Sequence, residues 1–301
     1  MGPEMGPGTG LGMGPGMRLG TGFVTSLGEG LGVDFDLLAV LVAALWGVAA
    51  GALLPRAVYR FSAPSGEAWR ERCPREHPVR GWLGRARCGQ CADGENGEGG
   101  QRADRESTDR ESAGAEGGQG AYGPGAGLLA AITAVVCAAL AAATGARPEV
   151  AVWLLLAPVG VLLAAVDLRV RRLPDPLTLP LAGAALLVLG LVALVPEHAG
   201  EWTTALLGSL ALGAGYLVLF LVNPAGMGFG DVKLALTAGA ALGWYGWPTL
   251  MLGTFAGFLL GAFYGGALLA TRRAGRKTAI PFGPFLIAGT FLGILVGAFA
   301  A

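Results

Sequence analysis

Residues 228–233 read Gly-Phe-Gly-Asp-Val-Lys and stand between two long apolar segments of a chain that otherwise keeps charge out of such segments. An ionised side chain at the edge of the hydrocarbon is costly, roughly 2.5 to 3.5 kcal/mol at a helix centre on insertion scales and less near the interface. Asp231 is therefore predicted to be functional rather than incidental. A second carboxylate, Asp167, stands at the end of another apolar run.

The apolar segments around these acids predict the fold. The chain has 301 residues, of which 53% are hydrophobic and 14% charged, and apolar runs of about 20 residues, enough to cross a bilayer, recur from residue 35 onward. Backbone groups in lipid must be satisfied within each segment, and the runs lack the alternation of a barrel, so the spans are predicted to be helices. We expect eight spans, at 35–54, 126–145, 149–167, 177–195, 203–222, 232–249, 251–270 and 281–300. The predicted fold class is an all-α polytopic membrane protein with a cytoplasmic loop domain between its first two helices.

Composition divides the chain into five regions. Residues 1–33 form a Met/Gly/Pro-rich tail with few apolar groups, and such a composition is typical of disorder. Residues 34–55 hold the first transmembrane helix, residues 56–91 a small cytoplasmic region that contains cysteines, and residues 92–125 a low-complexity linker. Residues 126–301 are expected to form a seven-helix catalytic membrane bundle.

The distribution of basic residues predicts the orientation. Net charge is zero, but with eight spans and an outside N-terminus one side carries almost all Arg and Lys, whereas the other keeps only Arg18 and Arg147. By the positive-inside rule the basic side is cytoplasmic. We therefore expect a multi-pass protein of the cytoplasmic (inner or plasma) membrane with Asp167 and Asp231 at its cytoplasmic face. Trp244, Tyr245 and Trp247 are then predicted to form an aromatic belt at the outer face.

Two nearby carboxylates suit peptide hydrolysis. One acts as a base toward water while the other, protonated, polarises the scissile carbonyl, and close acids share a proton because like charges cannot both ionise easily. Gly228 and Gly230, without β-carbons, would let a backbone pass close to Asp231. Lys233 could anchor the helix at the interface or act on the charge of the acid.

Asp175 is an alternative to Asp167 as the second acid. It lies between Pro174 and Pro176, which end one helix before the next begins. That position favours a helix cap or turn residue over a catalytic one.

Three stretches together resemble the type IV prepilin peptidases, which are GxGD intramembrane aspartyl proteases. Residues 228–234 match the second aspartate motif of that family, including Phe229. Residues 167–180 resemble the first aspartate motif and its Leu-Pro-Asp turn, and residues 280–285, with Pro281, Gly283 and Pro284, match the Pro-Phe-Gly-Pro start of the last helix. The resemblance covers most of residues 35–301 and is weakest over 92–125.

The resemblance implies a function. Such enzymes cleave the short basic leader from prepilins or pseudopilins at the cytoplasmic face, and many then methylate the new N-terminus with S-adenosylmethionine. Proteolysis itself would need no cofactor. The partners implied are prepilin or pseudopilin substrates and the lipid bilayer, with no nucleic acid; the sequence carries no indication of oligomeric state.

The cysteine region departs from the family pattern. Bifunctional relatives carry two Cys-x-x-Cys pairs that hold zinc; here the second pair is Cys88 and Cys91, whereas Cys73 has glutamate in the position of its partner. His77 is an available substitute, so the four side chains could hold structural zinc. A degenerate, metal-free loop is the alternative, and methyltransferase activity would be lost with it.

Two other functions remain as alternatives. One is a GxGD protease of presenilin or signal-peptide-peptidase type, against which Val166 stands where that group has tyrosine. The other is a proton- or cation-coupled transporter that binds its ion at the two acids, which would then lie near the middle of the membrane.

Overall fold

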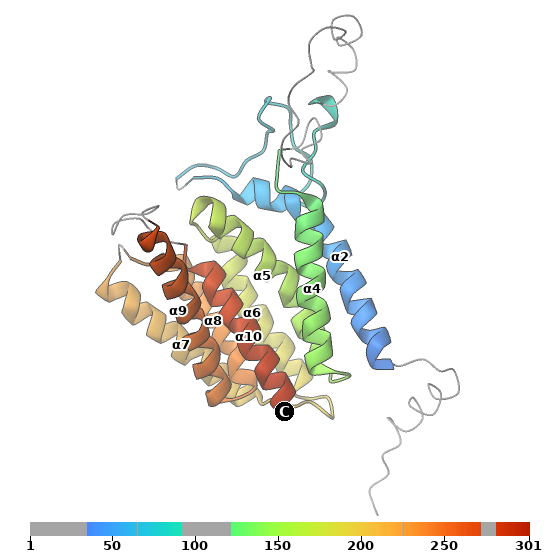
Figure 1. Ribbon diagram of the computed structural model, residues 1–301, viewed down its shortest axis with the longest axis vertical. Coiled ribbons are helices and arrows are strands. Elements are labelled where there is room, and N and C mark those ends of the chain that lie inside the picture. The colour runs from blue at the N-terminus through green and yellow to red at the C-terminus, as the bar shows by residue number, and fades with distance from the viewer. Residues whose placement is uncertain (1–34, 65, 92–121, 225, 272–280) are drawn as a thin grey trace, which may run out of the picture.

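The computed structural model describes residues 35–64, 66–91, 122–224, 226–271 and 281–301, and these form a helical bundle with a small segment at one end (Figure 1). The helices are α2 (Phe35–Phe61), α4 (Ala126–Thr144), α5 (Val150–Val170), α6 (Asp175–Val192), α7 (Trp202–Val222), α8 (Phe229–Trp244), α9 (Trp247–Ala270) and α10 (Gly283–Ala300). The only pairing of extended backbone among these residues is an isolated bridge between Arg72 and Pro78. The tail at 1–33 and residues 92–121 of the predicted linker lie outside the described residues.

Seven of the described helices are long and apolar enough to cross a membrane. This confirms the all-α polytopic membrane fold. The eighth, α8, has 16 residues and is therefore about 24 Å long, shorter than the hydrocarbon core. It occupies the middle of the bundle, where Ala235, Ala240 and Leu242 are fully buried. Because α8 is surrounded by protein rather than lipid, it does not need the length of an isolated span.

The predicted boundary between the sixth and seventh spans was wrong. Sequence patterning placed it near residue 250, but α8 ends at Trp244 and α9 begins at Trp247. Gly246, with φ of 95°, provides the turn in a conformation that other residues rarely adopt. Pro248 lies in the first turn of α9, where the missing N–H is not needed.

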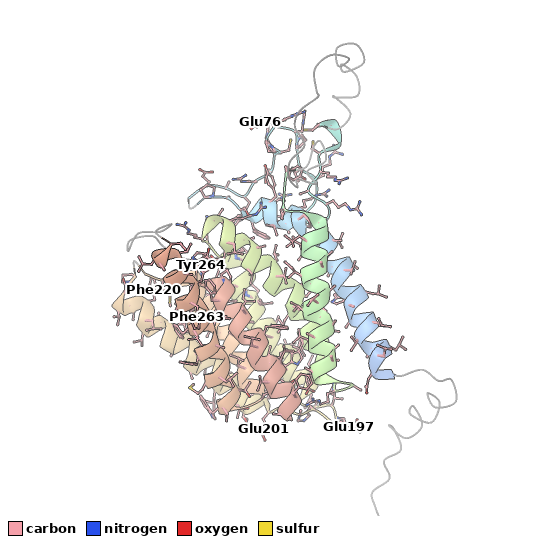
Figure 2. The ribbon with its side chains drawn as sticks, viewed as in Figure 1. Glu76, Glu197, Glu201, Phe220, Phe263 and Tyr264 are labelled. Carbon is pink, nitrogen blue, oxygen red and sulfur yellow. The ribbon has the colours of Figure 1, made fainter. Side chains whose placement is uncertain are left out.

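The aromatic belt was also predicted incorrectly at Trp244. This side chain is 1% exposed and packs in the core with Trp153, Leu189 and Ile294. Other aromatic side chains, Phe263 and Tyr264 of α9, do point outward from the bundle (Figure 2). A large aromatic residue near the end of a span can face either lipid or protein, and its own sequence does not distinguish the two.

Close helix contacts hold the bundle together. Gly208 of α7 and Gly239 of α8 meet backbone to backbone, and Gly47 of α2 meets the backbone of α4 at Thr133 and Ala134. Small residues allow this approach, from which membrane helices gain van der Waals contact.

The first helix is longer than the predicted span. It continues through Pro55 to Phe61 and changes direction near its end (Figure 1). An internal proline removes one helical hydrogen bond and commonly produces such a kink. Residues 62–64 and 66–91 lie over the same end of the bundle that carries Asp167 and Asp231, which we call the aspartate end. Glu197 and Glu201 lie at the opposite end (Figure 2).

Candidate functional site

Asp167 and Asp231 come together at the aspartate end of the bundle. Asp167 belongs to the last turn of α5 and Asp231 to the first turn of α8, and the two residues are 4% and 6% exposed. Both line one cavity of about 390 Å³, and the charge of Asp167 acts on Asp231. Neither acid is near the middle of its helix.

The glycine motif positions Asp231. Gly228 is the N-cap of α8, and its N–H donates a hydrogen bond of 3.2 Å to Oδ2 of Asp231. The N–H of Asp231 in turn donates to the carbonyl oxygen of Gly228 at 3.0 Å. The bond from the Gly228 N–H to the Asp231 carboxylate is one half of a capping box. A capping box satisfies backbone groups that the start of a helix leaves unpaired.

The start of α10 positions Asp167. The N–H of Gly283 donates to Oδ2 of Asp167 at 3.1 Å, and Pro284 occupies the first turn, where proline is well tolerated. A β-carbon at 283 would lie 2.8 Å from that same oxygen, so the approach requires glycine. Pro281 and Phe282, which precede it, line the cavity.

Each acid thus accepts a backbone N–H at the beginning of a helix, Asp231 from α8 and Asp167 from α10. The positive end of a helix dipole favours a negative charge there. Each carboxylate is bonded through one oxygen, Oδ2, so the other oxygen of each acid has no hydrogen-bond partner among the described residues. Such an arrangement can hold a water molecule and a carbonyl group between two oriented carboxyl groups.

Asp175 lies in the same cavity but has a different partner. Its Oδ1 is 2.8 Å from Nζ of Lys233, and its side chain is 68% exposed. Pro174 is the N-cap of α6, so Asp175 begins that helix. Lys233 also lies 4.9 Å from the centroid of the Phe229 ring. The ion pair therefore joins the starts of α6 and α8, a link that the sequence analysis missed.

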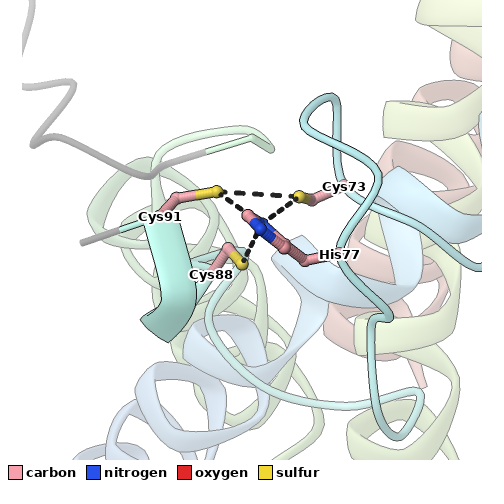
Figure 3. Close-up of side chains that lie close together, drawn as sticks. All are labelled: Cys73, His77, Cys88 and Cys91. Carbon is pink, nitrogen blue, oxygen red and sulfur yellow. Dashed lines mark hydrogen bonds between the residues drawn. The ribbon is translucent and has the colours of Figure 1, made fainter. Parts of the chain in front are cut away.

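The four predicted metal ligands also converge (Figure 3). One donor atom from each of Cys73, His77, Cys88 and Cys91 lies within 4.8 Å of all the others. Nδ1 of His77 is 3.7 Å from Sγ of Cys73, 3.2 Å from Sγ of Cys91 and 3.7 Å from Sγ of Cys88. Sγ of Cys73 and Sγ of Cys91 are 3.7 Å apart.

Three of these four separations are close to those of a tetrahedral zinc site, and the fourth, between His77 and Cys91, is shorter. Zn–S bonds of about 2.3 Å and Zn–N bonds of about 2.0 Å put sulfur atoms roughly 3.8 Å apart and sulfur and nitrogen roughly 3.6 Å apart. The two Cys73 contacts and the Cys88 contact are close to those values. His77, four residues after Cys73, therefore completes a set of four converging donors.

The thiols of this cluster differ in acidity. Desolvation acts to raise the pKa of Cys73, but hydrogen bonds from the backbone of Arg75 and His77 and from the side chains of Cys91 and His77 bring it down to about 7. Desolvation and the neighbouring Cys88 and Cys73 raise the pKa of Cys91 to about 11. A bound cation would displace these protons, because thiolates are the metal-binding form.

Two arginines of α2 that the sequence analysis did not single out bind residues 66–91, which we call the cysteine segment. Nη1 of Arg56 donates to the carbonyl oxygens of Arg80 and Leu83, at 2.8 and 3.2 Å. Nη1 of Arg60 donates to the carbonyl oxygen of Gly81 at 2.9 Å, and its guanidinium lies 4.1 Å from the centroid of Trp82. The sequence did not predict these contacts, because both residues were counted only among the basic residues of the predicted cytoplasmic side.

Tyr216 of α7 is a further residue that the sequence analysis missed. It is 1% exposed, and its hydroxyl has no hydrogen-bond partner among the described residues. The ring centroid of Tyr216 lies 5.9 Å from that of Phe282. The Tyr216 hydroxyl is also close enough to Asp231 for the two groups to interact electrostatically. The side chain therefore supports the wall of the cavity between the second acid and the start of α10.

Residues 154–266 match the type IV leader peptidase family. Among curated proteins, the chain is similar to the prepilin leader peptidase/N-methyltransferase of Aeromonas hydrophila, with 40% identity over 143 residues, or 44% of each chain. It is 39% identical to the protein of that name from Aeromonas salmonicida over 142 residues, again 44% of each chain, and 38% identical to that of Pseudomonas aeruginosa over 128 residues, 40% of each. No solved structure matches the chain.

These comparisons confirm the resemblance noted in the sequence. The chain spans less than half the length of the curated relatives it matches. The family match includes Asp167, Asp175, Asp231 and Lys233, and it ends before the Gly283 turn and excludes the cysteine segment.

Proposed function

We propose that this chain, whose residues 154–266 match the type IV leader peptidase family, is a membrane aspartyl endopeptidase that removes the basic leader from type IV prepilins or pseudopilins. The observation that carries the proposal is that Asp167 and Asp231 line one cavity at the ends of their helices. The acids would lie at the cytoplasmic face of the inner membrane, because the aspartate end also carries most of the described Arg and Lys.

The reaction requires the two acids in different protonation states. One carboxylate accepts a proton from water while the water oxygen bonds to the scissile carbonyl carbon, and the other carboxyl group donates a hydrogen bond to the carbonyl oxygen. When the tetrahedral intermediate collapses, the C–N bond breaks and the leaving nitrogen takes up a proton from the dyad. The N–H groups of Gly228 and Gly283 hold one oxygen of each acid, which leaves the other for this chemistry.

Surrounding residues would orient the substrate and the helices. Gly228 lines the cavity without a side chain, so an extended peptide can approach Asp231 there. The ion pair of Lys233 with Asp175 holds the start of α6 against the start of α8. Asp175 is therefore assigned a positioning role, since its Oδ1 is already paired and its side chain is mostly exposed.

The position of the acids favours a protease over a transporter. A coupled transporter is expected to bind its ion near the middle of the membrane, whereas Asp231 is the third residue of α8 and Asp167 lies in the last turn of α5. Their places at helix ends would instead let a cytoplasmic leader reach them.

Methylation of the new N-terminus is a second candidate activity, and the curated relatives carry it in their name. The observation that favours it here is the converging Cys73, His77, Cys88 and Cys91 set. Zinc held by these residues would fix the fold of the cysteine segment, and S-adenosylmethionine would supply the methyl group. Transfer of a labelled methyl group to a cleaved product, before and after removal of metal, tests this activity.

The test of the peptidase uses purified protein in lipid vesicles and a prepilin-like substrate with a basic leader. Cleavage is followed by mass spectrometry of the product N-terminus. Replacing either Asp167 or Asp231 by Asn should lower the rate by roughly 10² to 10⁴-fold, the usual contribution of a general acid or base. Normal cleavage by both variants would refute the assignment, and Asp175→Asn, which breaks only the ion pair with Lys233, is the comparison variant that should lose no more than a few-fold.

A further inference from the structure

A second cavity, which we call the lateral groove, lies within the membrane-spanning part of the bundle. It encloses about 530 Å³ and is lined mainly by apolar side chains of α4, α5, α8 and α10. It extends from Leu128 and Leu168 near the aspartate end to Leu140 and Ile294 toward the opposite end. Both helices that carry the candidate catalytic acids, α5 and α8, therefore contribute to its walls.

The groove is open to the lipid on one side. Leu128, Ile132 and Leu168 form its rim and are 64%, 42% and 58% exposed, whereas Leu163 and Ala238 on its floor are buried. Toward the opposite end, α4 and α10 are joined by Arg147, which follows α4 and donates a hydrogen bond to the carbonyl oxygen of Ala298. Because the rim is exposed, an apolar segment could enter the groove sideways from the bilayer.

At the aspartate end the groove meets the catalytic cavity. Pro284 lines the groove, Pro281 and Phe282 line the catalytic cavity, and Gly283 between them donates its N–H to Asp167. A chain that lies in the groove and continues past this turn would reach the acids.

A buried polar side chain, Thr237, contributes to the wall of the groove. Thr237 of α8 lines the groove and is 7% exposed, and its hydroxyl has no hydrogen-bond partner among the described residues. Thr133 and Thr290 instead donate to the carbonyl oxygens of Leu129 and Leu286, each at 2.7 Å, which is the usual solution for a threonine in a membrane helix. The hydroxyl oxygen of Thr237 is itself buried, so the side chain must rotate about χ1 before this group can bond a molecule in the groove.

The resemblance to prepilin peptidases implies a substrate whose basic leader is followed by a hydrophobic helix. We propose that the lateral groove is the docking surface for that helix, and that Thr237 hydrogen-bonds a polar group of it. This inference rests on the proposed peptidase function. A membrane-spanning helix occupies roughly 2,000 to 3,000 Å³, so the groove receives one face of it and the rest stays in lipid. Continuity with the acids favours this occupant over a lipid chain, because the substrate must place its scissile bond at Asp167 and Asp231 while its next residues remain in the membrane.

The test compares two substrates with reconstituted protein. One is a prepilin-like chain with leader and complete hydrophobic helix, and the other is a short soluble peptide that spans the cleavage site and lacks the helix. Gly160 of α5 lines the groove, and its β-carbon would meet only Ile287, at 3.6 Å. Gly160→Leu should therefore fill the groove without displacing the backbone. The matched control is Gly183→Leu on α6, where a β-carbon meets nothing within 4 Å.

Gly160→Leu should lower kcat/KM for the helix-bearing substrate by roughly tenfold or more, mainly through KM, because it blocks an apolar contact surface. Cleavage of the short peptide should change by no more than about twofold, and Gly183→Leu should affect neither substrate. Thr237→Val should raise KM for the helix-bearing substrate alone. Equal loss on both substrates, or no loss on either, would overturn the proposal. If the unaltered protein cleaves neither substrate, the peptidase function itself fails.

Cross-linking provides a readout that is independent of activity. A photo-cross-linking residue in place of Ile132, on the groove rim, should capture the substrate helix in an Asp231→Asn background that leaves it uncleaved. The same residue in place of Leu210, which is 57% exposed on α7 and does not line the groove, should not. Capture of lipid alone at 132, or equal capture of substrate at both positions, would contradict substrate docking.

Discussion

Gly283 and Asp167, 116 residues apart in the chain, are joined by a hydrogen bond of 3.1 Å from the N–H of the glycine to Oδ2 of the acid. Because a β-carbon at 283 would lie 2.8 Å from that oxygen, the contact depends on glycine as much as on the acid. The start of α10 is thus part of the candidate active site, although its apolar side chains carry no chemistry.

Gly283→Ala should abolish or strongly reduce leader cleavage by displacing the Asp167 carboxylate. The expected loss is roughly 10²-fold, since small misplacements of catalytic groups have effects of that size. Cleavage rate and thermal unfolding of the reconstituted protein are the measurements. Gly183→Ala, which adds a methyl group where there are no neighbours, is the control. Full activity of Gly283→Ala would show that the contact does not position the acid.

The two glycines of the Gly-Phe-Gly-Asp motif should respond differently to the same change. A β-carbon at Gly228 would make only an ordinary contact of 3.6 Å with Asp231, whereas one at Gly230 would lie 2.8 Å from Cβ of Leu173. Gly228→Ala should therefore leave the unfolding temperature unchanged and slow cleavage by narrowing the approach to Asp231. Gly230→Ala should lower both stability and activity. The prediction fails if Gly228→Ala is the less stable of the two.

The ion pair between Lys233 and Asp175 separates the positioning acid from the catalytic ones. Since Asp175 is largely exposed, breaking the pair should change the free energy of unfolding by no more than about 1 kcal/mol. Asp175→Asn and Lys233→Met should each reduce cleavage only a few-fold, and the double variant should be little worse than either, because both remove the same contact. A loss with Asp175→Asn as large as that of Asp167→Asn would make Asp175 catalytic instead.

The cysteine segment should bind one zinc ion per chain. Cys88→Ser should remove the metal, measured by elemental analysis of the purified protein, whereas Cys137→Ser, inside α4 and away from the cluster, should retain it. Binding should weaken as pH falls, because protons compete with the metal for the thiolates of Cys73, Cys88 and Cys91. Zinc retained by Cys88→Ser at full stoichiometry would exclude this ligand set.

The positions of the helices could be predicted because hydrophobic runs are local properties of the chain. The break between α8 and α9 was misplaced because residues 232–270 are almost continuously apolar and only the Gly246 turn and Pro248 separate them. Trp244 was assigned to the lipid interface although it is buried, since the choice depends on neighbours from α5, α6 and α10.

The site was predictable where short motifs carry it and not where distant side chains meet. The motifs placed Asp167, Asp231 and Gly283 in one family pattern, and the structure brings these residues to one end of the bundle. Two other contacts depend on how helices and loops pack against one another. These are the ion pair of Lys233 with Asp175 and the hydrogen bonds from Arg56 to the cysteine segment. Such contacts follow from packing of the whole bundle and leave no signal in a local sequence.

The most direct test of the central claim, that the two acids act as one dyad, compares cleavage rates of Asp167→Asn, Asp231→Asn and the double variant. Residues that act as a unit are strongly non-additive. Each single variant should therefore lose nearly as much activity as the double variant, with all three well folded. Losses that multiply in the double variant, or substantial activity in either single variant, would contradict a shared catalytic mechanism.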